Sequence, residues 1–326
     1  MKLLKTLFFA GIALLTFASC SPKSADLQTV IFDTDLGPDY DDVGALTMLH
    51  ALADSGEVKI LATISSNIDP LVAPCIDVIN RYYGRPDLPI GAPKTGVNLG
   101  DGHEEKWSEA LVARFPHDIK STADALDAVT LYRQLLANAK DASVVIVTVG
   151  FLTNLANLLE SPADNISPLN GLQLVSAKVK HLVSMAGGIP SGREFNVFMD
   201  TPASQKVFTE WPTRIIISGF EIGSKIFTGK RLIASSIAET PAKTCFTVCL
   251  RQDDFNGRQS WDETAVLVAV RGAREYFNTT RGRMTVASDG SNTWQDDPAG
   301  QHEYLSFKLS AEEIGRLMED MMMHER

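Results

Sequence analysis

The stretch Val30-Ile31-Phe32-Asp33-Thr34-Asp35-Leu36-Gly37-Pro38-Asp39-Tyr40-Asp41-Asp42 decides how this chain is expected to fold. The apolar run over 29–32 predicts a short buried strand, which Gly37 and Pro38 end. Apolar residues at helical spacing over 43–53 then predict a helix. The carboxylates of the stretch therefore lie between a strand's carboxyl end and a helix's amino end, where open α/β sheets bind ligands.

The carboxylates of this stretch repel one another, so their charge must be offset. A helix amino terminus stabilises a nearby anion by only about 0.3–1 kcal/mol. A hard divalent cation fits better, because Ca²⁺ collects about six to eight oxygen ligands, carboxylates prominent among them. The cluster therefore predicts a metal site. For one acid taken alone, such as Asp39, a helix cap among solvated neighbours is the alternative.

Strand-like and helix-like segments alternate along the rest of the chain. We expect strands at 58–65, 88–92, 143–149, 179–185 and 214–218, and helices at 71–83, 123–139, 153–160 and 262–270. A late hairpin within 284–309 and a C-terminal helix from Ser310 complete the pattern. The alternation predicts an α/β fold with an open, mainly parallel, doubly wound sheet and helices on both faces.

The N-terminal residues have the composition of an export signal. A basic start and an apolar run too short to span a bilayer end on small residues before Cys20, which is typical of a bacterial lipoprotein signal. We expect residues 1–20 to be this signal peptide, 21–27 a tether and 28–326 one catalytic domain. The protein would be exported and lipid-anchored through Cys20 in the bacterial cell envelope, on the periplasmic or outer-membrane face. An ordinary secretory signal or a buried anchor is the alternative.

Charge and cysteine content narrow the function class. Lys and Arg number 30 and Asp and Glu 40, so the formal net charge is −10. This argues against a nucleic-acid-binding surface, but not against uncharged nucleosides. Cys75, Cys245 and Cys249 form no Cys/His metal pattern. The last two would share a face if they lie on a helix, or could form a disulfide if they lie in a loop.

The acidic stretch resembles the N-terminal signature of the calcium-dependent, inosine-uridine preferring nucleoside hydrolases, Asp-x-Asp-x-Gly followed by Asp-Asp. In this chain Asp39-Tyr40 stands as a two-residue insertion in that signature. The other matching motifs come in the family's order: Ser66-Asn67, Gly150-Phe151-Leu152-Thr153-Asn154, Met185-Ala186-Gly187-Gly188, Glu194-Phe195-Asn196 and Trp261-Asp262. The resemblance covers roughly residues 28–275.

The resemblance implies hydrolysis of the N-glycosidic bond of ribonucleosides to free base and ribose. Such a reaction passes through an oxocarbenium-like transition state and needs an activated water and groups that grip the sugar. The family pattern implies a Ca²⁺-bound water activated by Asp41 as general base. The implied metal ligands are Asp35, Asp42, Asp262 and the main-chain carbonyl of Val149, and the implied ribose ligands are Asn67, Glu194 and Asn196. Asp33 is expected to support the loop.

Some of these residues also have simpler explanations. For Asn67 the alternative is an Asx-turn at a strand end, and for Glu194 it is an ordinary acid in a surface loop. Asp262 taken alone is explained as an acid in the first turn of a helix.

One departure from the family bears on the leaving base. Trp261 stands where many members have a His that protonates the base. Tryptophan cannot act as an acid, but it can stack on a purine, so we expect a preference for purine nucleosides, as in purine salvage. The alternative is that Trp261 is a packing residue, with the acid to be sought among loop residues such as His103.

Two rival functions compete with this interpretation. The run Phe32-Asp33-Thr34-Asp35 also resembles haloacid-dehalogenase-type phosphatases, with Asp33 as nucleophile and Asp35 as acid. A tethered lipoprotein that binds a nucleoside or sugar without catalysis is the non-enzymatic alternative. We expect a small-molecule nucleoside as the partner, no nucleic acid, and membrane contact only through the anchor on Cys20. A homo-oligomer is left open.

Overall fold

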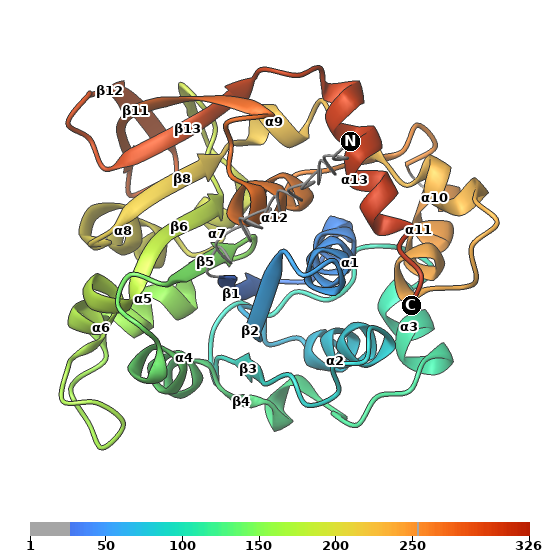
Figure 1. Ribbon diagram of the computed structural model, residues 1–326, viewed down its shortest axis with the longest axis horizontal. Coiled ribbons are helices and arrows are strands. Elements are labelled where there is room, and N and C mark those ends of the chain that lie inside the picture. The colour runs from blue at the N-terminus through green and yellow to red at the C-terminus, as the bar shows by residue number, and fades with distance from the viewer. Residues whose placement is uncertain (1–26, 253) are drawn as a thin grey trace, which may run out of the picture.

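The computed structural model describes residues 27–252 and 254–326 (Figure 1). The predicted signal peptide, Cys20 and residues 21–26 of the predicted tether lie outside these ranges. Within them, no helix combines the length and the apolar content needed to cross a bilayer.

One eleven-stranded sheet forms the centre of the molecule (Figure 1). Its strand order is β4-β3-β2-β1-β5-β6-β8-β13-β11-β12-β7. The bounds are β1 Gln28–Thr34, β2 Val58–Ser65, β3 Ile90–Ala92, β4 Leu126–Asp127, β5 Val144–Thr148, β6 Val179–Met185, β7 Ser191–Gly192, β8 Arg214–Ser218, β11 Phe277–Val286, β12 Asn292–Asp296 and β13 His302–Phe307. Neighbours from β4 to β13 are parallel, which confirms the mainly parallel sheet. The antiparallel pairs lie at one edge.

Strand β1 marks the switch point of the sheet. It pairs in parallel with β2 on one side and with β5 on the other. Val30 and Phe32 pack into one core, and Ile31 packs into the core on the opposite face. A strand buried on both faces needs an unbroken apolar run, which is what its sequence offers. Its carboxyl end therefore opens into the crevice where such sheets hold ligands.

Helices cover both faces of the sheet, as expected (Figure 1). One face carries α1 Asp41–Asp54, α2 Val72–Tyr82, α3 Trp107–Arg114, α11 Pro241–Gln252, α12 Asp262–Arg271 and α13 Ala311–Met322. The other carries α4 Ala128–Asn138, α5 Thr153–Glu160, α6 Gly171–Lys178 and α8 Thr201–Glu210. The shorter helices are α7 Phe195–Met199, α9 Phe220–Gly223, α10 Lys230–Ala234 and the 3₁₀ helix Thr122–Asp124, and β9 Phe227–Thr228 pairs with β10 Arg258–Gln259.

Two of the predicted elements differ from the structure. The helix expected over 123–139 begins only at Ala128, because Asp127 caps it by accepting from the Thr130 N–H, and residues 126–127 join the sheet as β4 instead. The late hairpin expected within 284–309 is a three-stranded unit that starts earlier, at Phe277.

The two C-terminal cysteines lie on one helix. Cys245 and Cys249 both belong to α11, and both are free thiols buried in the core. The helix settles the alternative that the sequence leaves open, in favour of a shared face.

Candidate active site

The acidic stretch makes a tight turn between β1 and α1. Leu36 and Gly37 have positive φ angles of 41° and 141°. The Leu36 N–H donates to Thr34 Oγ1 at 3.0 Å and to Asp42 Oδ1 at 3.2 Å. The Thr34 hydroxyl also donates to Asp42 Oδ1. These bonds fix the first turn of α1 against the end of β1.

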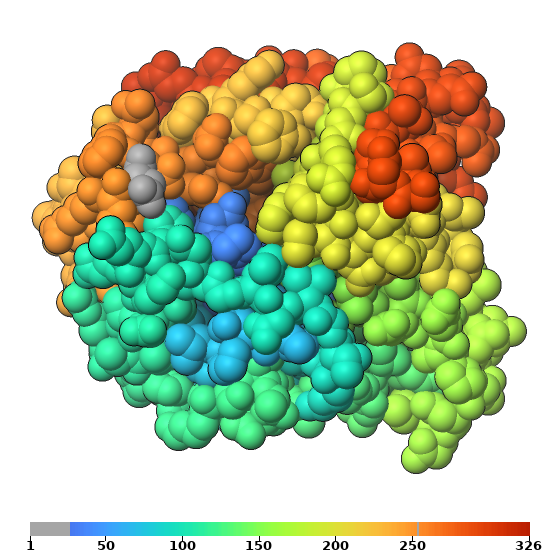
Figure 2. All heavy atoms as spheres, turned by 180° about the vertical axis from the view of Figure 1, so that it is seen from behind, coloured from blue at the N-terminus to red at the C-terminus, as the bar shows by residue number. Residues whose placement is uncertain are grey.

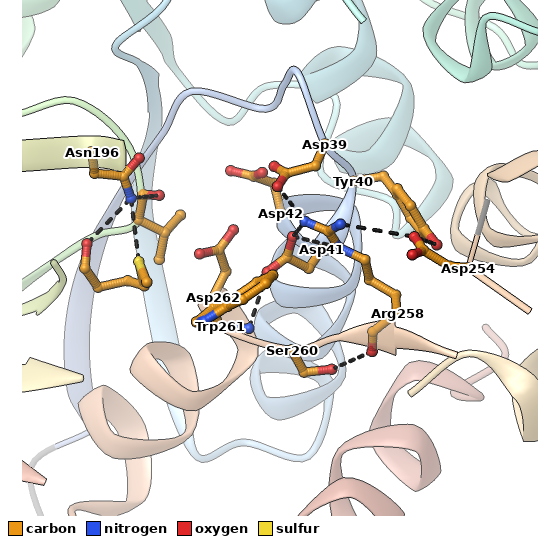
Figure 3. A network of polar contacts seen from close by, with 12 residues as sticks. Asp39, Tyr40, Asp41, Asp42, Asn196, Asp254, Arg258, Ser260, Trp261 and Asp262 are labelled. Carbon is orange, nitrogen blue, oxygen red and sulfur yellow. Dashed lines mark hydrogen bonds and ion pairs between the residues drawn. The ribbon is translucent and has the colours of Figure 1, made fainter. Parts of the chain in front are cut away.

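The turn gathers four buried carboxylates, which we call the acidic wall: Asp35, Asp41, Asp42 and Asp262. Figure 3 shows the last three of them. None of them is more than 4% exposed. Asp262 is the first residue of α12 and reaches the turn from far along the chain. Burial, followed by repulsion from Asp41, raises the pKa of Asp42 to about 7. Burial and neighbouring carboxylates also hold the pKa values of Asp35 and Asp262 well above the usual range.

Arg258 divides the acids into two groups (Figure 3). Its Nε and Nη2 donate to Asp41 Oδ1 at 3.1 and 2.8 Å, and Nη2 also pairs with Asp39. The second oxygen of Asp41 accepts from the Trp261 N–H at 3.0 Å. Among the described residues, Asp35, Asp42 and Asp262 have no such cationic partner.

A cavity opens onto the acidic wall at the carboxyl ends of the central strands. It is lined by Asp35, Asp39, Asp41, Val149, Met185, Glu194, Phe195, Asn196, Phe220, Trp261 and Asp262. In Figure 2, blue surface from the N-terminal part of the chain is visible in a hollow between teal, yellow and orange segments. Seven of the nine residues assigned roles from the sequence therefore meet around one cavity. Three larger hollows on the described surface contain none of them.

The side of the cavity opposite the acidic wall is held by main-chain bonds. Glu194 caps α7, its carboxylate accepting from the N–H groups of Asn196, Gly187 and Val197 at 2.8–3.2 Å. The Asn196 side-chain amide donates to the Val149 carbonyl oxygen at 2.9 Å. Burial nevertheless raises the pKa of Glu194 to about 7. Both side chains are thus fixed in place before any ligand enters.

Three aromatic side chains form the rim of the cavity, and we call them the aromatic wall: Phe195, Phe220 and Trp261. Phe195 is 37% exposed and Phe220 49% exposed. The Trp261 indole N–H donates to the Phe220 carbonyl oxygen at 2.9 Å, and the two rings lie 5.3 Å apart at 30°. This bond fixes the orientation of the indole, which presents a flat apolar face suited to a heteroaromatic ring.

The structure does not bring Asn67 into the cavity. Its Oδ1 accepts from the N–H groups of Asp69 and Leu99, and its Nδ2 donates to the carbonyl oxygens of Asp35 and Leu99. The bond to Asp69 is the Asx-turn that the sequence offered as the alternative. Asn67 therefore braces the loop that carries Asp35, and it does not face a sugar.

His103 and Asp33 also lie behind the cavity rather than in it. Asp101 bonds the His103 ring at 3.2 Å, and this bond, with one to Cys249, raises the pKa of His103 to about 10. Asp33 is fully buried and accepts from Tyr132 Oη at 2.8 Å and Asn154 Nδ2 at 3.1 Å. Neither side chain lines the cavity.

The donor set of the acidic wall fits a hard cation such as Ca²⁺. All the candidate ligands are oxygens, and Asp42 Oδ2 is buried with no hydrogen-bond partner in the part of the chain that the structure describes. Carboxylate oxygens of Asp39, Asp41 and Asp42 lie within 4.8 Å of one another. Since Arg258 engages Asp39 and Asp41, the carboxylates of Asp35, Asp42 and Asp262 remain for an ion. Asp35, Asp262 and Val149 line the cavity, whereas Asp42 is not among its lining residues.

Arg258 and Phe220 are site residues that the sequence did not reveal. Arg258 lies on a two-residue strand paired only with β9, and nothing in the sequence links it to Asp41. Phe220 begins a four-residue helix, too short to show a periodic pattern. The one available signal was the position of Arg258, three residues before the Trp261-Asp262 motif.

Relatives share part of this chain's sequence. The inosine-uridine preferring nucleoside hydrolase of Crithidia fasciculata is 25% identical over 199 residues, covering 58% of this chain and 59% of that protein. An enzyme of the same name from Leishmania major is 27% identical over 194 residues, covering 56% of this chain and 57% of the relative. The chain spans between 57% and 65% of the length of the curated relatives it matches.

Solved structures share the fold, and a family model shares the sequence pattern. A plant nucleoside hydrolase superimposes with a TM-score of 0.67 at 19% identity, covering 91% of this chain and 99% of its own. Residues 30–304 match the model of the inosine-uridine preferring nucleoside hydrolases. That match spans the turn after β1 and the start of α12, and by it the chain belongs to the inosine-uridine preferring nucleoside hydrolase family.

Proposed function

We propose that the protein hydrolyses the N-glycosidic bond of ribonucleosides, with purine nucleosides preferred. The observation that supports this best is the cavity, which sets Asp35 and Asp262, two carboxylates without a cationic partner among the described residues, opposite the Glu194–Asn196 segment and under an aromatic rim. A nucleoside has matching parts: a bond to be attacked by water, a sugar rich in hydroxyls and a flat base. Family membership points to the same reaction.

Each part of the cavity has a proposed task. Ca²⁺ held by Asp35, Asp42, Asp262 and the Val149 carbonyl would orient the attacking water and lower its pKa. Glu194 and Asn196 accept hydrogen bonds from the ribose hydroxyls, which fixes the sugar for attack. Trp261 and Phe220 stack on the base and exclude water around it as the glycosidic bond breaks.

Two carboxylates compete for the role of general base. We assign it to Asp41 from the sequence, but both of its oxygens accept hydrogen bonds, from Arg258 and from the Trp261 main chain. Asp35 is the second candidate, because it lines the cavity and burial raises its pKa, which suits proton acceptance. Asn variants of each residue, described below, separate the two.

The first test is a nucleoside panel. Purified protein is incubated with inosine, guanosine, adenosine, uridine and cytidine in the presence of Ca²⁺, and free base and ribose are resolved by chromatography. We expect ribose release, fastest from purine nucleosides, and its loss after exhaustive chelation. Tight nucleoside binding without any ribose release would instead favour the non-catalytic binding protein.

The phosphatase alternative is not supported by the position of Asp33. A nucleophile must reach its substrate, whereas the Asp33 carboxylate is fully buried and bonded to Tyr132 and Asn154. No phosphate release from a colorimetric substrate, with or without Mg²⁺, is the expected result.

We also propose that the chain is exported and lipid-anchored through Cys20, on the basis of its N-terminal sequence alone. Expression in a bacterium with a labelled fatty acid checks this. Wild-type protein should carry label and fractionate with membranes, whereas Cys20→Ala should lose the label. An unlabelled, processed wild-type protein would instead support an ordinary secretory signal.

A further inference from the structure

Arg258 is surrounded by acidic and aromatic side chains beside the acidic wall. Its guanidinium carbon lies 5.1 Å from the centre of the Tyr40 ring and 5.2 Å from that of Trp261, and the side chain is 10% exposed. Its Nη1 lies 3.8 Å from Asp254, which also accepts from the Tyr40 hydroxyl at 2.7 Å. The guanidinium is therefore held by ion pairs in its plane and by ring faces above it.

Through Asp41, this contact joins two segments that are distant in sequence. Asp41 opens α1, and its second oxygen accepts from the main-chain N–H groups of Trp261 at 3.0 Å and Asp262 at 3.4 Å. The Arg258–Asp41 pair thus fixes the start of α12, which carries one proposed metal ligand and one residue of the aromatic wall.

We propose that Arg258 is a positioning residue of the proposed hydrolase site: it withholds Asp39 and Asp41 from the metal and sets Trp261 and Asp262 against the turn after β1. This inference rests on the proposed function. The guanidinium, with a single positive charge, offsets part of the charge of Asp39 and Asp41 and engages an oxygen of each. Among the described residues, the cation is thus left to the three acids without a cationic partner. A planar guanidinium is required because one side chain must donate hydrogen bonds to Asp41 and Asp39 at the same time. The ammonium group of a lysine does this less well.

The two parts of this role, charge and geometry, predict opposite effects in one variant. Arg258→Gln removes a positive charge beside the metal site, so Ca²⁺ should bind more tightly, by roughly tenfold, because two uncompensated carboxylates add to the field at the ion. The same variant frees Asp41 and the start of α12, so kcat should fall by roughly 10- to 100-fold, as expected for misplaced groups. A merely structural role would weaken both properties together.

Arg258→Lys separates charge from geometry. It restores the positive charge without the fork, so the Kd for Ca²⁺ should return close to the wild-type value while kcat recovers only in part. Ca²⁺ binding to the purified full chain is measured by calorimetry, and kcat with inosine. Arg271→Gln is the matched control: Arg271 pairs with Glu57 at 2.7 and 2.8 Å at the opposite end of α12 and should leave both quantities unchanged.

Several results would overturn the proposal. One is an Arg258→Gln protein that is folded, as shown by a cooperative thermal unfolding transition, and has an unchanged kcat. A folded Arg258→Gln protein that binds Ca²⁺ more weakly than the wild type is another. A third is an Arg258→Lys protein with the wild-type kcat. If the Gln variant does not fold, the kcat of the Lys variant tests the proposal without it. If wild-type protein hydrolyses no nucleoside, the proposed function fails, while the Ca²⁺ titrations still test the placement of Arg258.

Discussion

The acidic wall and the aromatic wall of the cavity are built in different ways. The four carboxylates are at most 4% exposed, and three of them belong to one continuous stretch that is bonded to the end of β1. Phe195 and Phe220 are 37% and 49% exposed and begin short helices of five and four residues. The buried wall can hold an ion in a fixed geometry, whereas the exposed wall can change its residues at little cost in stability. We therefore expect chemistry to depend on the first and substrate choice on the second.

The strongest test of this comparison is loss of the metal or of a ligand from the acidic wall. Asp262→Ala, or chelation of the wild type, should lower kcat with inosine by roughly three decades or more, because several kcal/mol of charge stabilisation is lost. Added Ca²⁺ should restore the chelated wild type but not the variant. Full activity of the chelated, metal-free protein would show that hydrolysis does not need a metal ion held by the acidic wall.

A second test identifies the base within the acidic wall. Loss of the general base should lower kcat by roughly two to four decades, so Asp35→Asn and Asp41→Asn are compared by kcat and by Ca²⁺ affinity. If Asp41 is the base, its variant loses kcat and keeps most of its Ca²⁺ affinity. If Asp35→Asn has the larger loss and Asp41→Asn retains activity within tenfold, Asp41 holds α12 in place and Asp35 accepts the proton.

A third test concerns the aromatic wall. Stacking contributes about 0.5–1.5 kcal/mol beyond burial, so Trp261→Ala should lower kcat/KM for inosine by roughly 2- to 12-fold more than for uridine. Trp261→Phe should recover part of the loss. Trp294→Ala is the control, because Trp294 packs on Tyr304 outside the cavity. Equal losses for both substrates would make Trp261 a packing residue.

The smallest expected effect is on stability. Burial raises the pKa of Asp42 to about 7, so the folded metal-free protein keeps a proton there that the unfolded chain has released above about pH 4. This group therefore destabilises the metal-free fold progressively as pH rises from about 4 to 7. Ca²⁺ needs the ionised carboxylate, so it should raise Tm by several degrees at pH 8 and by much less at pH 5. Calorimetric scans at both pH values check this, and a Ca²⁺ shift independent of pH would contradict it.

The strand, turn and helix around the acidic stretch could be predicted because their signals are local. The apolar run, Gly37-Pro38 and the spaced leucines each act on neighbouring residues, and β1 and α1 formed where they were expected. Local signals gave a wrong prediction at 123–139, because helical spacing does not indicate that residues 126–127 pair with the edge of the sheet. Helices α3, α6 and α8 were not predicted, and α11 was left open between a helix and a loop, because the stability of such helices depends on packing partners elsewhere in the chain.

The same difference between local signals and long-range contacts applies to the site residues. The resemblance implied that Asn67 holds the ribose, but its amide bonds the backbone of a loop at Leu99 that the sequence could not place beside it. Arg258 meets Asp41 only in the folded chain. Glu194, Asn196 and Trp261, which the resemblance also supplied, do line the cavity, and their roles there stay predictions.

Strand β1 has a kinetic consequence. It is hydrogen-bonded on both edges, to β2 and β5, and lies between two cores, so its amides should be among the slowest in the protein to exchange with deuterium. Local opening that frees the turn after it must disturb that central unit. The rim helices α7 and α9 are also held by hydrogen bonds, at Glu194, Asn196 and Phe220, but each is a short helix outside the sheet. Opening and closing during turnover should therefore occur at the rim, while the residues from Asp35 to Asp42 stay in place.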